Sequence, residues 1–152
     1  MNKAKLVLLM VASMAVSITG YCQPAKTPNE HAARIPAIKL INTPDNHSAF
    51  IKGSIPALEK ISAQKFWLSN STEDWEKNTH PAPRKQYVIT LKGKLQFKVS
   101  DGSTFTIAPG TVLLAEDTGG AGHSWEMVEG SEWVRVYIPM VDDKDDFVAE
   151  KQ

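Results

Sequence analysis

Polar side chains capable of chemistry recur at alternate positions from His80 onward. Successive side chains of an extended strand point to opposite faces, so His80, Arg84 and Gln86 are predicted to share one side of a sheet. A polar strand face either meets water or lines a polar cavity. The planar guanidinium of Arg84 matches a carboxylate or a phosphate, which makes Arg84 a candidate clamp for an anionic or sugar-like ligand. Pairing with Glu116 is the structural alternative.

A second polar segment runs from Glu116 to His123 and is rich in glycine. We interpret its glycines as a flexible approach to His123 rather than as a nucleotide-binding loop. If His123 meets His80, the two imidazoles either hold a ligand or form a cavity wall and hydrogen-bond Glu116 or Asp117. The aromatic residues that can line such a cavity, or pack in the core, are Trp67, Trp125, Trp133 and Tyr137.

The clearest pair of strands covers residues 94–99 and 103–108, where apolar and polar residues alternate. This alternation predicts one buried and one wet face. A two-residue turn at Asp101-Gly102 would mix the two faces. A three-residue loop instead places Phe97 opposite Phe105 and puts Gly102 at the left-handed position that such loops require.

Further short runs of strand-forming residues are separated by turn sequences such as Asn42-Thr43-Pro44-Asp45-Asn46. The polar stretch at residues 71–74 favours the start of one brief helix. Many short strands with scarcely a helix predict an all-β fold, an antiparallel β-sandwich or barrel. The remaining predicted strands cover residues 35–41, 48–55, 65–68, 111–115, 125–128 and 132–140.

The N-terminus has the order of a secretory signal peptide, with early lysines, an apolar run from Leu6 to Ile18 and then small residues. The apolar run is too short to span a bilayer. We predict cleavage after Cys22; the alternative is a lipoprotein in which Cys22 carries the lipid. The predicted organisation is a signal peptide (1–22), a flexible linker (23–34), one folded domain (35–141) and a solvated acidic tail (142–152), located in the periplasm or outside the cell.

The charge balance argues against binding to nucleic acid. The chain has 17 basic and 17 acidic side chains, and losing Lys3 and Lys5 with the signal peptide leaves 15 against 17, a formal charge of −2. No basic field then attracts nucleic acid. The single cysteine, Cys22, would be lost as well, so the mature domain would have to be stable without a disulfide.

The segments around His80 and His123 resemble the paired motifs of small single-domain cupins. They are similar to largely uncharacterised bacterial cupins with a His-x-Ala-Pro-Arg strand, here residues 80–84, and a Leu-Leu-x-Glu-Asp-Thr-x-Gly-x-Gly-His segment, here residues 113–123. The resemblance implies a cupin-like jelly roll with a cavity inside its barrel. This sequence departs from the cupin pattern at Ala82, where the second histidine would stand, and at Gln86, where the glutamate would stand.

The resemblance also implies a place for one divalent transition metal, with zinc, manganese, iron and nickel undistinguished. The implied ligands are His80, Gln86, His123 and Glu116. The amide oxygen of Gln86 is a weak, neutral ligand, so this set is poorer than the family pattern. Three interpretations stay open: a metal site, a site for a polar or anionic molecule, and histidines that only form a cavity wall.

The predicted function is binding of a small polar or anionic molecule by a secreted or periplasmic cupin, with His80, Arg84, Gln86, Glu116 and His123 around the ligand. The alternative is a metal-dependent cupin enzyme of isomerase or oxygenase type, and the sequence leaves open whether any catalysis follows. The expected macromolecular partner is a second copy of the chain, in a homodimer formed by edge strands at residues 35–41 or 133–140. Neither nucleic acid nor, after signal removal, a membrane is an expected partner.

Overall fold

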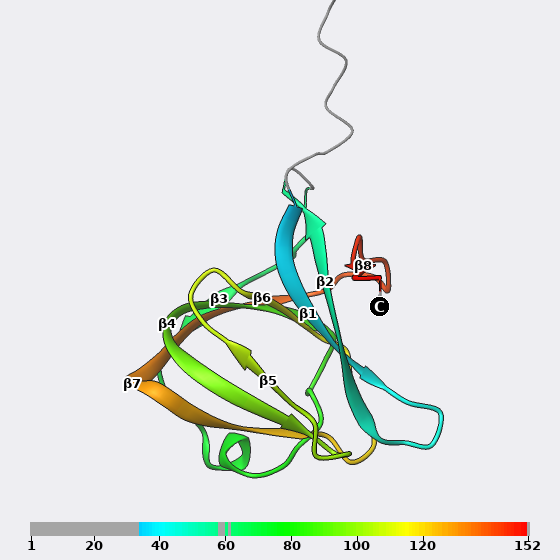
Figure 1. The fold of residues 1–152 in the computed structure, drawn as a ribbon. Helices are drawn as coiled ribbons and strands as arrows, with labels where there is room; N and C mark the ends of the chain where they lie inside the picture. Colours follow the sequence, from blue (N-terminus) through cyan, green and yellow to red (C-terminus); the bar gives the residue numbers. More distant parts are fainter. Residues whose placement is uncertain (1–33, 58–59, 61, 152) are drawn as a thin grey trace, which may run out of the picture.

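The computed structural model describes residues 34–57, 60 and 62–151 (Figure 1). The predicted signal peptide and residues 23–33 of the predicted linker lie outside the described residues. The described part is all-β, as predicted, and among its residues no helix is long and apolar enough to cross a membrane. Its elements are β1 (Arg34–Asn42), β2 (Ser48–Pro56), β3 (Trp67–Ser69), the 3-10 helix η1 (Asp74–Lys77), β4 (Gln86–Val99), β5 (Thr104–Ile107), β6 (Val112–Ala115), β7 (His123–Pro139) and β8 (Val148–Ala149).

The strands form a single mixed sheet in the order β3-β7-β4-β6-β1-β2-β8, with β5 paired to β4 outside this path. Neighbouring strands are antiparallel except β1 and β6, which run parallel. The sheet bends strongly, and the long strands β4 and β7 run side by side along it (Figure 1). The bend brings β2 against β5, where the ring centroids of Phe50 and Phe105 lie 4.7 Å apart.

The predicted β-hairpin has the expected register. Phe97 pairs with Phe105 across β4 and β5, and the loop between them is closed by a hydrogen bond from the Gly102 amide to the Val99 carbonyl. Gly102 has a φ of 88°, the left-handed conformation that the three-residue loop requires. The prediction of the three-residue loop is therefore confirmed.

The prediction of two separate strands at residues 125–128 and 132–140 was wrong, because β7 is continuous from His123 to Pro139. The turn-like residues around Gly130 do not interrupt β7. They lie where its pairing with β4 is irregular, and the register of β4 shifts between Thr90 and Leu95. Gly93 lies at this irregularity with a φ of 91°, and a side chain there would collide with the carbonyl of Glu132. A glycine at that position thus lets β4 and β7 stay paired along their length.

The core has two faces because successive strand residues point to opposite sides. The inner face, on the concave side of the sheet, includes Val88, Phe97 and Leu113. The outer face includes Tyr87 and Leu114, the sequence neighbours of Val88 and Leu113. All four residues of β6 are buried, so this strand is covered on both sides.

The acidic C-terminal segment is partly docked, whereas the sequence predicted a fully solvated tail. β8 pairs with the edge of β2, and the Asp145 carboxylate accepts a hydrogen bond of 2.6 Å from Lys39. Phe147 packs against the outer core. The predicted solvation holds for Asp142 and Asp143, which are exposed. Pairing with Lys39 and a nearby apolar face explains why the segment does not extend into water.

Candidate functional site

A small cavity of about 30 Å³ lies against the inner face of the sheet, and His80, Gln86 and His123 all line it. We call it the inner cavity. Gln86 is the first residue of β4 and His123 is the first residue of β7. The structure thus brings together three of the predicted site residues. The full lining is Trp75, Glu76, His80, Ala82, Pro83, Gln86, Val88, Phe97, Leu113, Ala115, His123, Trp125, Trp133 and Tyr137.

His80 reaches the inner cavity by a route that differs from the predicted one. The expected continuous strand from His80 to Gln86 is absent, since β4 begins only at Gln86 and the preceding residues include Pro81 and Pro83, which have no N–H to donate. His80 instead forms an isolated bridge with His123, in which each backbone amide donates to the other residue's carbonyl at 2.9 and 3.0 Å. Strand parity therefore does not apply across this segment.

The ring of each histidine is oriented by a contact of its Nδ1 atom. His123 Nδ1 lies 2.6 Å from the buried Asp117 carboxylate, which also accepts a hydrogen bond of 2.8 Å from the Ser48 hydroxyl. His80 Nδ1 lies 2.6 Å from the carbonyl of Asn78. A carbonyl or carboxylate can only accept, so Nδ1 carries a proton in each ring, and Nε2 is the ring nitrogen left for other partners.

The two imidazole rings are close, with centroids 4.9 Å apart. Burial lowers the pKa of His80, and the neighbouring His123 lowers it further, against the opposing hydrogen bond to Asn78. His80 is therefore neutral at pH 7 and presents its Nε2 lone pair. The Trp75 ring packs edge-on against it at 4.8 Å.

Gln86 adds a third acceptor to the inner cavity. Its side chain is buried, and its Oε1 atom has no hydrogen-bond partner among the described residues. Buried side-chain oxygens nearly always have a donor, so such an atom calls for an explanation. Together with the two imidazoles it forms a set that can receive hydrogen bonds or coordinate a cation.

A buried ion pair beside these acceptors was missed in the sequence. Glu76 of η1 accepts a hydrogen bond of 2.9 Å from Arg135 and one of 3.0 Å from the Tyr137 hydroxyl. Burial is the main cause that raises the pKa of Tyr137 to about 12. Arg135 has the same strand parity as Trp133 and Tyr137, and this shared parity is the one sequence signal that could have predicted an inward-facing Arg135 side chain.

Arg84 and Glu116 lie outside the inner cavity. Arg84 is exposed and its guanidinium lies over the Trp67 ring at 5.5 Å. Glu116 forms an ion pair of 3.2 Å with Lys39 that is not aligned as a hydrogen bond, and burial raises its pKa. The expected pairing of Arg84 with Glu116 does not form. Alternation along β6 gives the reason, because Ala115 faces the inner cavity and Asp117 continues on that side while Glu116 points outward.

The metal set implied by the cupin resemblance is incomplete in this geometry. Among residues 34–57, 60 and 62–151, no three His, Cys, Asp or Glu side chains converge as metal ligands. Asp117 is engaged by His123, and Glu76 by Arg135. The candidate ligands that remain are two imidazoles and one amide oxygen, with no carboxylate among them, so the residues fit a weakly held dication better than a tightly bound one.

No protein-family model matches the chain, and no curated protein matches it. The assignment of a function therefore rests on the geometry of the inner cavity.

Proposed function

We propose that this chain is a small cupin-type protein that binds a compact polar molecule in its inner cavity, through His80, His123 and Gln86. The observation that carries the proposal is the buried Gln86 amide oxygen without a donor. An unpaired buried acceptor costs about 1–3 kcal/mol, and a bound donor removes that cost. The bent all-β sheet and the cupin-like segments at residues 80–84 and 113–123 agree with this assignment.

The ligand class follows from the acceptors. Two imidazole Nε2 atoms and an amide oxygen favour a neutral or cationic donor over the anion that the sequence also suggested, because Arg84 lies outside the inner cavity and Arg135 is held by Glu76. The volume of about 30 Å³ admits one small donor group, since a cavity needs only about 10–15 Å³ to hold a water molecule. The rest of a larger ligand would extend past Trp75, which is exposed.

The test is Gln86→Met, which removes the acceptor and keeps a side chain of similar size. We expect the free energy of unfolding to rise by about 1–3 kcal/mol, because the unpaired oxygen is gone. We also expect the histidine chemical shifts to stop responding to methylammonium, guanidinium and formamide, followed by nuclear magnetic resonance. Gln96→Met on the same strand is the matched control and should change neither property.

A stability gain in Gln86→Met with an unaltered response to all three probes would place the binding groups elsewhere. A wild type that responds to acetate but to none of the three donors would contradict the ligand class.

A divalent metal is the second candidate, and the orientation of the two histidines favours it. Metal-ligating histidines commonly donate their other ring nitrogen to a carbonyl or carboxylate, as His80 and His123 do here. Gln86 would be the third protein ligand. Zinc, manganese, iron and nickel all accept such donors, and the metal would support isomerase or oxygenase chemistry of the cupin type.

Thermal unfolding of the wild type, His80→Ala and His123→Ala separates the two candidates. A metal site predicts stabilisation of the wild type by added zinc, manganese, iron or nickel, reversal by EDTA, and no such response in either variant. The metal candidate is rejected if added metal does not stabilise the wild type and elemental analysis finds no metal in it. His123→Ala should also lose about 1–3 kcal/mol without metal, because the Asp117 carboxylate stays buried with one partner fewer.

We further propose that the protein acts in the periplasm or outside the cell, on the strength of the basic and apolar pattern of residues 1–22. Intact-mass measurement of protein recovered from the periplasm should give a chain that begins at Gln23. A diacylated Cys22 would contradict this and make the protein a membrane-tethered lipoprotein.

A further inference from the structure

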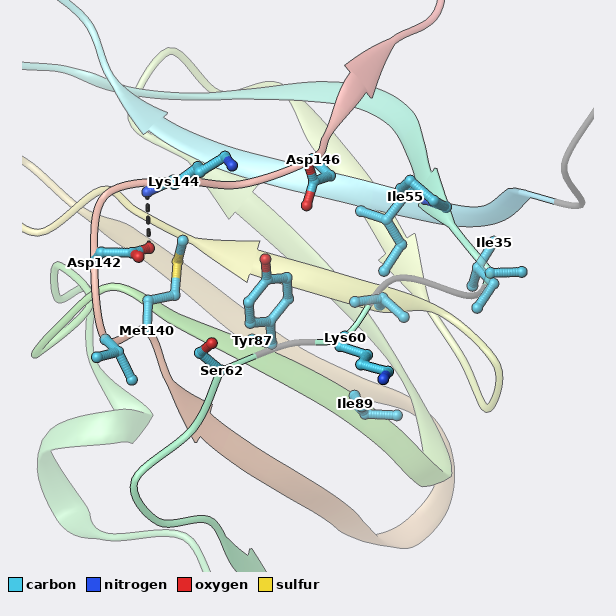
Figure 2. Close-up of a pocket in the computed structure, with 14 residues that line it drawn as sticks. Ile35, Ile55, Lys60, Ser62, Tyr87, Ile89, Met140, Asp142, Lys144 and Asp146 are labelled. Carbon is cyan, nitrogen blue, oxygen red and sulfur yellow. Dashed lines mark hydrogen bonds between the residues drawn. The ribbon is translucent and has the colours of Figure 1, made fainter. Parts of the chain in front are cut away.

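A larger pocket of about 310 Å³ lies on the outer face of the sheet, and we call it the outer pocket (Figure 2). It is separate from the inner cavity, because Tyr87 and Ile89 line it while Gln86 and Val88 of the same strand line the inner cavity. Small-molecule pockets begin at about 300 Å³. Its apolar lining is Ile35, Ile55, Pro56, Ala57, Tyr87, Ile89, Val112, Met140 and Val141.

The Tyr87 hydroxyl points into the outer pocket (Figure 2). The Tyr87 side chain belongs to a residue that is only 5% exposed, yet its hydroxyl makes no hydrogen bond to any residue that the structure describes. The hydroxyl oxygen is not among the buried side-chain atoms that lack a partner, so it is open to the space of the outer pocket. The Tyr87 hydroxyl is thus a polar group of the outer pocket that a ligand can reach.

The charges around this hydroxyl are mainly negative. Burial raises the pKa of Tyr87, and the carboxylates of Asp145, Asp146, Glu116 and Asp142 raise it further. Lys39 neutralises Asp145 and Glu116, and the Asp142 carboxylate accepts the backbone amide of Lys144.

The Asp146 residue lines the outer pocket, and its carboxylate has no hydrogen bond or ion pair with the described residues; the Arg34 guanidinium donates to the Asp146 backbone carbonyl at 3.4 Å. Lys144 and Lys60 also line the outer pocket. The Lys60 amine points away from the Tyr87 hydroxyl, whereas Asp146 lies on the hydroxyl's side of the outer pocket (Figure 2). Among the described carboxylates that line the outer pocket, Asp146 is therefore the one without a side-chain partner, and it lies beside the Tyr87 hydroxyl.

We propose that the outer pocket binds an aliphatic amine. The hydrocarbon chain lies on the apolar floor formed by side chains such as Ile55, Ile89 and Val112, and the ammonium group donates hydrogen bonds to the Tyr87 hydroxyl and the Asp146 carboxylate. Apolar burial supplies most of the affinity, and the two oxygens select a cationic head group. This site is independent of the function proposed for the inner cavity.

The test compares octylamine, 1-octanol and octanoate below their micellar concentrations by titration calorimetry on the full mature chain. The three probes share a hydrocarbon chain and differ in head-group charge. We expect octylamine to bind at least about tenfold more tightly than octanoate, a difference of about 1.4 kcal/mol. Tyr87→Phe and Asp146→Asn should each weaken octylamine binding about threefold to tenfold, the range of a single hydrogen bond.

Asp143→Asn is the matched control, because it removes the same charge from the same segment while the Asp143 carboxylate pairs with Lys85 outside the outer pocket. It should leave octylamine binding unchanged. Ile89→Trp fills the outer pocket and should abolish binding, with circular dichroism confirming that each variant is folded.

Equal losses in Asp143→Asn and Asp146→Asn would overturn the proposal, since they would mean diffuse attraction to an acidic segment. The proposal would also be overturned if octanoate bound as tightly as octylamine. The same holds if octylamine at millimolar concentration did not bind the folded wild type. If Tyr87→Phe fails to fold, Asp146→Asn and Ile89→Trp still decide the outcome.

Discussion

The residue with the largest predicted effect on stability is Glu76. Arg135 is 1% exposed and Glu76 is 7% exposed, and the two form an ion pair of 2.9 Å inside the fold. Removing one partner of a buried pair leaves an uncompensated charge. We expect Glu76→Gln to lower the free energy of unfolding by about 3–5 kcal/mol, measured by urea denaturation.

The matched control for Glu76→Gln is Glu132→Gln, which breaks the exposed pair with Lys92. Exposed pairs contribute little, so this variant should unfold close to the wild type. Similar losses in the two variants would show that the Arg135 guanidinium reaches water after the substitution.

The Tyr137 hydroxyl should titrate unusually late. Its pKa is raised to about 12 from an ordinary value of 10.0, chiefly by burial. The folded state then keeps a proton that the unfolded state loses, so the stability that Tyr137 contributes is complete below pH 10 and is lost as the pH rises to about 12. Absorbance at alkaline pH should show one phenol with an apparent pKa near 12, and Tyr137→Phe should lack it. A wild type whose phenols all titrate near 10 would contradict the buried hydroxyl.

At the scale of single elements, the β4–β5 hairpin depends on Gly102. Its φ of 88° is strained for any residue with a Cβ, although a Cβ there would touch nothing within 4 Å. The cost of Gly102→Ala is therefore conformational, about 1–2 kcal/mol, measured as a lower free energy of unfolding. Gly119→Ala is the control, because Gly119 lacks a positive φ and its nearest neighbour would be Asn42 Oδ1 at 3.9 Å.

An unchanged stability of Gly102→Ala would mean that the loop relaxes to a different turn. In that case exchange of the backbone amide at position 102, which in the wild type donates to the Val99 carbonyl, should be faster in the variant.

At the scale of the whole molecule, the edges of the sheet decide how copies of the chain can pair. The two segments predicted as dimer edges are both paired on two sides: β1 lies between β2 and β6, and β7 pairs with β3 at residues 135–137 and with β4 on its other side. In the described part of the chain β3 and the short β8 end the main strand order, and β5 is a further edge strand because it pairs with β4 alone. Phe66 and Leu68, at β3, are 65% and 62% exposed.

We still expect a homodimer, now formed through β3, because an apolar free edge invites pairing with a second copy. Sedimentation at micromolar concentration should show a dimer for the wild type and a monomer for Leu68→Lys, since charges on an edge strand oppose pairing. Leu91→Lys, the same change at an exposed position of β4, should remain dimeric. A wild type that sediments only as a monomer rejects the dimer.

The sequence by itself determined the elements whose physics is local. Alternating apolar residues predicted the strands, and the three-residue loop with Gly102 predicted the register of β4 and β5, because side-chain parity and turn geometry depend on a few neighbouring residues. The capping residues at the start of η1 were likewise readable, and the capping box at Glu73 and Glu76 forms. The sequence left both Glu116 and Asp117 open as partners of His123, and the structure shows that Asp117 is the partner.

Only the tertiary structure decided what lies across from these elements. The bridge between His80 and His123, the burial of Arg135 against Glu76 and the docking of Asp145 onto Lys39 join residues far apart in the chain. Arg84 lies outside the inner cavity because β4 begins only after it. Pro81 and Pro83 influence that starting point, but the pairing of β4 with β6 and β7 sets it. Such contacts depend on how the whole sheet bends, and no local pattern of residue types carries that information.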